Sequence, residues 1–365
     1  MLITELKKFS YLIILVFAII LPCYFLFSKN SVHKEKTESE MPHFEKTSLD
    51  NLTTLLKDEK NPAIPFGKKN DWDEYIREIG NILYEPYAKD NEKFKTFYSG
   101  YNGEYKENNV YIGYATSSDG INWKKQGKII NRSLEDPYVV KYKNVYYLFV
   151  EDKGRLTKKG KPSFRNIRRY HSLDCKNWID DGIILDIDEG GIPLNWQNKD
   201  VSSPIVYIEN GIWYLFYEGR GKPNTELKTK HISSLGKIGL AISNDGFHFK
   251  KISQRPIIDV GKPGDWDDRG VVPDDLIKYN NTYYLIYHGN GHFLAPLFCR
   301  DWACWRTGIA KSEDLIHFEK LKFNPINPLN GMSDTAMIYF NGKDFVFHLV
   351  AKEGIERFYS AKIKK

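Results

Sequence analysis

The sequence predicts an all-β protein whose folded part is a five-bladed β-propeller, and three observations indicate this. First, aromatic residues make up 15% of the 365-residue chain, with 24 Tyr and 21 Phe, and aromatic side chains suit a pleated, half-buried surface. Second, a short hairpin motif recurs four times. Third, each copy follows a strand pair of similar sequence. The repeating unit therefore holds about four strands, which is the size of one propeller blade.

The hairpin motif consists of Ser, an Asp two residues later, and an aromatic residue four positions after the Asp. The four copies are SSDGINW from 117, SLDCKNW from 172, SNDGFHF from 243 and SEDLIHF from 312. Asp-Gly favours a tight turn, and the aromatic side chain can pack back beneath it. We therefore interpret the motif as structural.

Two strands precede each copy of the motif. The first strand contains a proline, in YEPYAK, EDPYVV, SSPIVY and VVPDDL. The second reads KFKTFYSG, VYYLFVED, IWYLFYEG and TYYLIYHG. A fifth, degenerate unit, SDTAMIYFNGKDFVFHLV, comes near the end of the sequence. We expect a strand from around residues 66–82 to complete this fifth blade and so protect the sheet edges; a β-sandwich would not explain repeats of this length.

The N-terminal region differs in composition from the rest of the chain. After a short tail of residues 1–8, residues 9–27 form an uncharged apolar run, which at helical rise approaches the ~30 Å hydrocarbon core of a bilayer. No good small-residue cleavage site follows it, so we predict an uncleaved transmembrane signal-anchor helix. Residues 28–65 are polar and read as a linker. The propeller domain is expected over residues 66–365, on the extracytoplasmic side of the membrane.

Charge and cysteine usage exclude other classes of function. The net charge of +6 is spread along the chain and forms no basic stripe, so a nucleic-acid partner is not expected. Cys23 lies in the predicted span, whereas Cys299 and Cys304 could pair outside the cytosol, which leaves Cys175 over. No spacing of the CxxC or HExxH kind appears, so we predict neither a metal nor a cofactor.

The start of each blade predicts a site. Inner strands of a propeller line its central channel, so residues near their starts converge on one funnel. The residues at that position are Glu85, Asp136, Ser203, Val272 and Asp334. The following strands end at Ser99, Glu151, Glu218 and His288. Such carboxylates suit glycoside hydrolysis, because one protonates the leaving oxygen while another activates water or attacks carbon, and crowding of like charges raises one pKa.

The order of these motifs resembles that of the five-bladed propeller glycosidases, which include families 43 and 32 and the mannoside phosphorylases of glycoside hydrolase family 130. Three stretches are most similar to the last group, namely EDPYVV from 135, KDVSSPIVY from 199 and LIYHGNG from 285. The similarity spans residues 70–330. It implies that Asp136 is the proton donor and that Lys199, Asp200 and His288 contact sugar or phosphate.

Departures from the family pattern point to water as the nucleophile. The family phosphorylases carry arginines that hold phosphate at the ends of two strands, where this chain has Ser99 and Glu218. Because a carboxylate repels phosphate, we expect hydrolysis, with Glu218 or Glu151 as the base. The propeller glycosidases also include invertases, whose pattern has an Asp in blade one. This chain has Glu85 at that position, so Glu85 is a further catalytic candidate.

Several other residues are candidates for less direct roles. For substrate binding these are Arg269, Asp274 and Asp334. Glu135 is expected to tune its neighbour Asp136. Three tryptophans in similar contexts are interpreted as blade-packing residues first and sugar platforms second, namely Trp72, Trp196 and Trp266. The apolar insertion at 292–305 is either a lid over the funnel or a contact to membrane or partner.

The sequence therefore predicts a membrane-anchored glycosidase that acts on an extracytoplasmic or cell-envelope oligosaccharide or polysaccharide. Two alternatives stay open, a glycan phosphorylase or transferase on the same fold and a non-catalytic carbohydrate-binding propeller. Asp136 is the only Asp-Pro among the five inner-strand positions, so the chemistry is expected to depend on it.

Overall fold

A computed structural model describes most of the compact unit Met41–Lys365. The described residues are 49, 52, 55–106, 108–154, 160, 165–187, 195–221, 236–252, 254–291, 305–326, 335–340 and 345–360. The predicted span at 9–27, Asp334, Cys299 and residues 292–304 lie outside them. Within the described part of the chain, no helix is long and apolar enough to cross a membrane.

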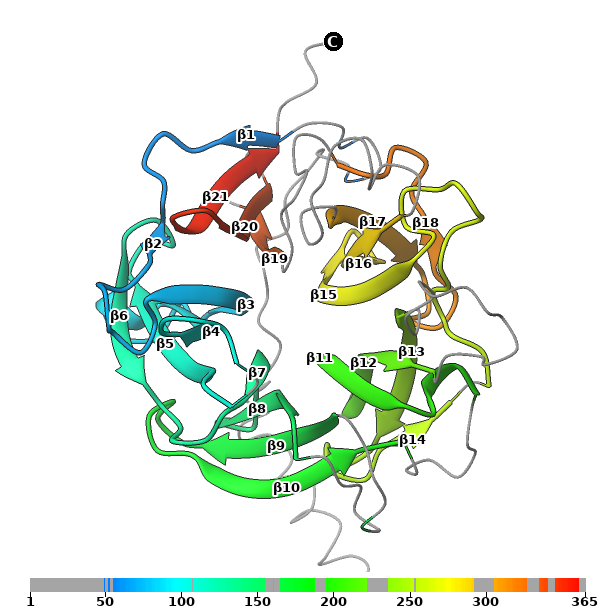
Figure 1. The fold of residues 1–365 in the computed structure, drawn as a ribbon, viewed down its shortest axis with the longest axis horizontal. Coiled ribbons are helices and arrows are strands. Elements are labelled where there is room, and N and C mark those ends of the chain that lie inside the picture. Colours follow the sequence, from blue (N-terminus) through cyan, green and yellow to red (C-terminus); the bar gives the residue numbers. More distant parts are fainter. Residues whose placement is uncertain are drawn as a thin grey trace, which may run out of the picture. The chain divides into compact units, whose positions relative to one another are not determined.

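Five antiparallel sheets surround a central axis (Figure 1), which confirms the predicted five-bladed propeller. Blade one holds β3 (Tyr75–Tyr84), β4 (Phe94–Tyr101), β5 (Tyr111–Ser117) and β6 (Trp123–Lys128). Blade two holds β7 (Glu135–Tyr142), β8 (Val145–Asp152), β9 (Asn166–Ser172) and β10 (Ile179–Leu185). Blade three holds β11 (Asp200–Glu209), β12 (Ile212–Arg220), β13 (Gly236–Ser243) and β14 (Lys250–Lys251). Blade four holds β15 (Gly270–Tyr279), β16 (Thr282–Asn290), β17 (Arg306–Ser312) and β18 (Glu319–Lys320).

Blade five is completed by residues that the sequence assigned to the linker. It consists of β19 (Thr335–Phe340), β20 (Phe345–Ala351), β21 (Gly354–Ser360), β1 (Leu55–Lys57) and β2 (Ile64–Pro65). Both N-terminal strands pair with β21, and Arg357 Nε donates to Asp58 Oδ2 at 2.9 Å. The expectation that residues 66–82 close the ring is therefore wrong. That stretch contains the start of β3, the inner strand of blade one, whose Ile76 and Ile79 are buried.

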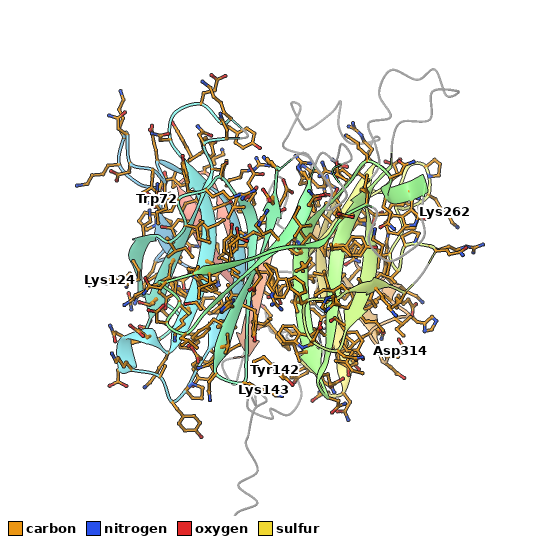
Figure 2. The ribbon with its side chains drawn as sticks, turned by 90° about the horizontal axis from the view of Figure 1, so that it is seen from below. Trp72, Lys124, Tyr142, Lys143, Lys262 and Asp314 are labelled. Atoms are coloured by element: carbon orange, nitrogen blue, oxygen red, sulfur yellow. The ribbon has the colours of Figure 1, made fainter. Side chains whose placement is uncertain are left out.

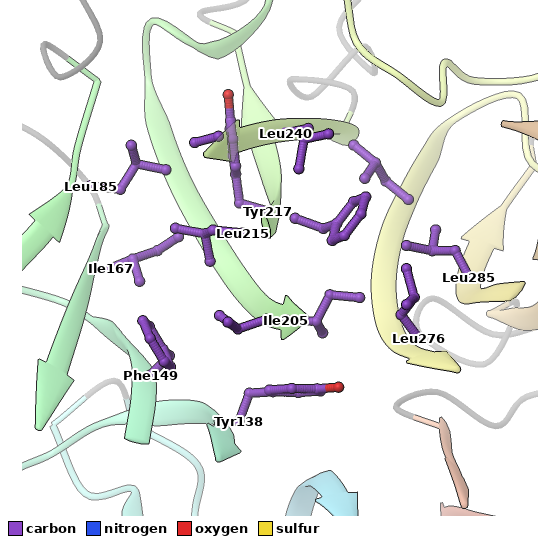
Figure 3. Packing of buried hydrophobic residues seen from close by; sticks show 14 of the residues in the cluster. Tyr138, Phe149, Ile167, Leu185, Ile205, Leu215, Tyr217, Leu240, Leu276 and Leu285 are labelled. Carbon is purple, nitrogen blue, oxygen red and sulfur yellow. The ribbon is translucent and has the colours of Figure 1, made fainter. Parts of the chain in front are cut away.

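The hydrophobic core lies between neighbouring blades. The second strand of each blade is buried on both faces, because another blade packs on either side. Figure 3 shows Phe149 from blade two, Leu215 from blade three and Leu285 from blade four in one continuous cluster. This packing makes each blade depend on its neighbours for burial of apolar surface.

The three tryptophans pack inside their blades, as interpreted from the sequence. Each stacks on a buried tyrosine, in the pairs Trp72–Tyr98, Trp196–Tyr217 and Trp266–Tyr287, with ring centroids 5.7, 6.3 and 5.6 Å apart. Each pair also lies against a glycine of the third strand. At Gly239, for example, an added Cβ would meet Tyr217 Cζ at 2.4 Å.

The two ends of the propeller axis carry different features. We call the end at which the inner strands β3, β7, β11 and β15 begin the acidic end, and the opposite end the hairpin end. Figure 2 shows Trp72 and Lys262, which precede inner strands, towards one end, and Tyr142, Lys143 and Asp314 towards the other. Turns of the Ser-Asp motif therefore lie far from the starts of the inner strands.

Candidate active site

Four inner strands pair with their neighbours in matching register near the acidic end. The matching pairs are Glu78 with Ser99, Glu135 with Glu151, Ser202 with Glu218, and Val272 with His288. A bulge or other irregularity follows this position in each inner strand. Bulges bend a strand and re-aim its side chains. The predicted strand-end residues therefore occupy equivalent places in four blades.

Asp136 lies in the bulge of β7, at the boundary with blade three. Its backbone is in the left-handed region with φ of 49°, and Ser203 of blade three has φ of 47°. This conformation is rare for residues other than glycine, and such strain collects at functional sites. The Ser203 hydroxyl donates to Asp136 Oδ2 at 2.6 Å. The half-exposed carboxylate is thereby held between two blades.

Glu151 provides a neutral carboxyl group next to that position. The residue is 3% exposed, and its Oε1 lies 2.6 Å from Arg165 Nε. Burial raises the pKa of Glu151, and the negative charges of Asp136 and Glu135 add to this against the effect of Arg165, so that the pKa is about 8. Glu151 therefore carries a proton at neutral pH.

Glu218 is buried too, but its environment favours the ionised form. Arg220 donates to both carboxylate oxygens, at 2.7 and 2.6 Å, and Ser202 donates to Oε2 at 2.8 Å. Burial alone would raise the pKa of Glu218, but the charge and hydrogen bonds of Arg220 outweigh it and the pKa is lowered. Asp200 lies 4.0 Å from Arg220 Nε, and burial raises its pKa. The half-exposed Lys199 contributes positive charge to Asp200.

Glu135 is surrounded by donors, and its pKa is lowered. Lys153 Nζ donates to Oε1 at 2.5 Å and the Tyr105 hydroxyl does so at 3.0 Å, while Arg77 Nε lies 3.4 Å from Oε2. Burial would raise the pKa of Glu135, but Arg77 and Lys153 outweigh it. Glu135 is therefore an anion that helps to keep Glu151 protonated.

Blade one contributes Glu78 to this cluster, a residue that the sequence interpretation missed. Glu78 forms an ion pair with Arg77 and accepts a hydrogen bond from Ser99, and the backbone N–H of Asp136 points to its Oε2 at 3.5 Å. The sequence pattern does not reveal it, because the pattern predicts YEPYAK as the inner strand of blade one. That strand is YIREIGNILY, which ends just before Glu85.

Glu85 does not join the other predicted carboxylates. It follows the end of β3, at the hairpin end, where Lys95 and Lys141 donate to its two oxygens at 2.6 and 2.5 Å and Tyr146 donates at 2.8 Å. Since Lys141 and Tyr146 belong to blade two, Glu85 joins neighbouring blades. The same arrangement joins blades three and four through Glu209, Lys278 and Tyr283. A catalytic role for Glu85 is thus not supported by its position.

Blade four places His288 at the same level as Glu151 and Glu218. Its Nδ1 lies 2.5 Å from Asp274 Oδ1, and its ring meets Trp305 edge-on with centroids 4.7 Å apart. The structure therefore brings His288 and Asp274 together as a pair, with the carboxylate orienting the imidazole. Arg269 lies just before β15 and is half-exposed.

Comparison with known proteins agrees with the resemblance seen in the motifs. No protein-family model matches the sequence. A β-1,2-mannobiose phosphorylase of Thermoanaerobacter sp. (strain X514) is 27% identical over 158 residues, which are 42% of this chain and 48% of the relative. The chain thus spans about half the length of the curated relatives it matches, or less.

Solved structures share the fold at low identity. A glycosyl hydrolase from Bacteroides ovatus has a TM-score of 0.62 at 14% identity, covering 87% of this chain and 96% of that one. A second structure has a TM-score of 0.59 at 14% identity and covers 87% of this chain and 96% of that one. Its description reads that the GH130 family of mannoside phosphorylases contains glycoside hydrolases that target β-1,2 mannosidic linkages in Candida mannan.

The fold is therefore the five-bladed propeller on which glycoside hydrolases and glycan phosphorylases are built. Within that class, the resemblance to the mannoside phosphorylases of family 130 is confirmed by the curated relative and by this structural neighbour.

Proposed function

We propose that the protein is a glycoside hydrolase that cleaves an oligosaccharide at the acidic end, with Asp136 as the proton donor. The observation that carries this proposal is the position of Asp136, held by Ser203 in a strained bulge and surrounded by the buried carboxyl groups of three blades. The left-handed backbone and the Ser203 hydroxyl together hold the half-exposed carboxylate between two blades.

The two predicted candidates for the base differ in protonation. Environments that push the pKa values of neighbouring carboxyl groups apart supply both an acid and a base. Glu218 is the ionised group, so we assign it the activation of water. Glu151 stays protonated to about pH 8 beside Asp136, so we infer that these two residues share the proton delivered to the leaving oxygen.

The charge of the cluster favours water over phosphate as the nucleophile. Arginines do reach the acidic end, at positions that the family comparison did not point to, namely Arg77, Arg165 and Arg220. Each of them is already paired with a carboxylate. With Glu151 protonated, the five acidic groups Glu78, Glu135, Asp136, Asp200 and Glu218 equal in number the basic groups Arg77, Lys153, Arg165, Lys199 and Arg220, so the cluster offers no excess of positive charge to a phosphate. An incoming phosphate would have to displace these pairs.

Phosphorolysis is the second candidate, because the curated relatives are phosphorylases and because Arg165 and Arg220 lie next to the proposed acid and base. Incubation of the protein with β-1,2-linked mannobiose, with and without inorganic phosphate, separates the two. Free mannose that does not depend on phosphate supports hydrolysis. Mannose 1-phosphate formed only with phosphate would overturn it.

Asp136→Asn tests the proton donor. We expect turnover to fall by about 10²- to 10⁴-fold, since that is the usual contribution of a general acid, while oligosaccharide binding is largely retained. Turnover is measured by release of reducing sugar and binding by calorimetry. Full turnover by this variant would refute the assignment, and binding without turnover by the wild type would leave a carbohydrate-binding propeller.

We also propose that the apolar run at 9–27 anchors the protein in a membrane with the propeller on the extracytoplasmic side. The support is the length and hydrophobicity of that run. Fractionation of cells that express the full chain, followed by protease treatment from outside, tests this. Recovery of the protein in the soluble fraction, or protection of the propeller from external protease, would contradict it.

A further inference from the structure

A row of tyrosines extends outward from the acidic cluster along the rim of blade one. Tyr105 donates its hydroxyl to Glu135, and its ring meets that of Tyr101 edge-on with centroids 5.5 Å apart. Tyr101 in turn stacks on Tyr75, with centroids 5.4 Å apart and planes at 28°. We call Tyr75, Tyr101 and Tyr105 the aromatic row.

The outer member of the row is exposed in an unusual place. The exposed large hydrophobic side chains among the described residues are Leu56, Tyr75, Tyr87, Leu173, Ile179 and Ile316. Four of these, Tyr87, Leu173, Ile179 and Ile316, lie in turns of the hairpin end or directly after one, and a fifth, Leu56, lies on the outermost strand of blade five. Tyr75, at 39% exposure, alone begins an inner strand at the acidic end.

The row is held rigidly rather than carried on a loose loop. The Arg77 guanidinium lies 4.4 Å from the centroid of the Tyr105 ring, and Lys153 donates to the Tyr105 hydroxyl at 2.7 Å. The Asn109 amide donates to the carbonyls of Asn102 and Glu104 at 3.2 and 3.0 Å, which braces the loop that carries Tyr105. A preorganised surface of this kind costs little conformational entropy when it binds a ligand.

We propose that the aromatic row is an outer subsite that binds a further sugar ring of the oligosaccharide, beyond the rings at the cleaved bond. The C–H face of a pyranose is apolar, and ligand sites combine aromatic surface with a few polar groups that fix orientation. The row offers ring surface together with tyrosine hydroxyls. It also continues without a break from Glu135 to Tyr75. The protein therefore prefers oligosaccharides longer than a disaccharide.

This inference rests on the proposed function, and binding to an inactive variant tests it separately. The full chain with Asp136→Asn is titrated with β-1,2-linked mannobiose, mannotriose and mannotetraose. We expect the tetraose to bind on the order of tenfold tighter than the biose, from stacking on one further ring. Adding Tyr75→Ala should remove most of that gain, and Tyr75→Phe should keep it because the ring remains.

Tyr87→Ala is the matched control, because Tyr87 is 96% exposed and lies in the turn after β3 at the hairpin end. It should leave the ratio of tetraose to biose affinity unchanged. Tyr101→Ala provides a second test should Tyr75→Ala fail to fold. Equal affinities for all chain lengths, or a gain that survives both tyrosine substitutions, would overturn the proposal.

The outcomes separate the two proposals. Length-dependent binding that needs Tyr75, without turnover by the wild type, would preserve the subsite and reject the hydrolase. Turnover of mannobiose without any effect of chain length would do the reverse. If no member of the series is bound or cleaved, both proposals fail for this class of substrate.

Discussion

The hairpin end and the acidic end are formed by the same repeated strands. At the hairpin end the residues at equivalent positions repeat from blade to blade, whereas at the acidic end they differ. At the hairpin end, the four serines of the motif donate to their aspartates at 2.9, 3.0, 2.8 and 2.9 Å, and each aspartate accepts two backbone N–H bonds. At the acidic end, the matching strand pairs are Glu with Ser, Glu with Glu, Ser with Glu, and Val with His in blades one to four, so no two blades have the same arrangement.

This difference separates the residues that serve folding from the residues that serve the proposed reaction. A turn needs the same hydrogen bonds in every blade, so its residues repeat. A reaction needs an acid, a base and orienting groups in different places, so equivalent positions must differ. The buried carboxylates are tolerated there because arginine, lysine and hydroxyl groups pair with them. The predictions below test this contrast, beginning with the largest expected effect.

The first prediction concerns Gly80, where blades one and two approach closely beside Asp136. An added Cβ would lie 1.9 Å from the Pro137 carbonyl oxygen, so Gly80→Ala must push the two inner strands apart. We expect a loss of about 3 kcal/mol of unfolding free energy, measured by urea denaturation, and reduced turnover. Gly270→Ala is the control, since its nearest neighbour would be 3.6 Å away. Equal stability of the two variants would refute the close approach.

The second prediction uses the raised pKa of Glu151. Its folded-state pKa of about 8 lies above the ordinary 4.5, so the folded protein binds the proton more tightly. The resulting stability is complete below pH 4.5 and is lost as pH rises to about 8. Between pH 6.5 and 8 this amounts to on the order of 2 kcal/mol. Glu151→Gln should flatten the pH dependence of stability in that window. An unchanged slope would show that Glu151 is ionised at neutral pH.

The third prediction concerns a motif residue at the hairpin end. Asp174 accepts backbone N–H bonds from Lys176 and Asn177 at 2.9 and 2.8 Å, so Asp174→Ala should cost about 1 kcal/mol of stability, as the loss of a cap does. Turnover at a temperature well below unfolding should not change. A loss of turnover without a loss of stability would break the separation between the two ends.

The smallest effect is expected at His348, which belongs to neither end. It is fully buried on β20, neither ring nitrogen has a hydrogen-bond partner among the residues that the structure describes, and burial followed by the charge of Arg357 lowers its pKa to about 3. His348→Leu should therefore leave stability unchanged or raise it by about 1 kcal/mol at neutral pH. A clear loss of stability in thermal unfolding would indicate that the imidazole is satisfied in the folded protein.

Local sequence patterns predicted much of this molecule. The hairpin motif revealed four of the five blades, because its hydrogen bonds form between residues only two or three positions apart. The motif even tolerates Cys175 and Leu315 where the other copies have glycine. Both residues adopt the same left-handed conformation, with φ of 61° and 65°, and both are buried. The matching of Ser99, Glu151, Glu218 and His288 also followed from this repeat.

Such local patterns could not predict contacts between residues that are far apart in the sequence. Leu55 pairs with Ser360, and no local periodicity encodes a pairing across some 300 residues. In blade one, β3 is buried on both faces and pairs in an irregular register, so the sequence pattern did not identify it as the inner strand. The pattern therefore indicated Glu85 in place of Glu78. The arginines of the acidic end were missed for a related reason. Arg77, Arg165 and Arg220 each pair with a carboxylate of their own blade, but the burial of these pairs depends on the neighbouring blades, which only the folded ring brings together.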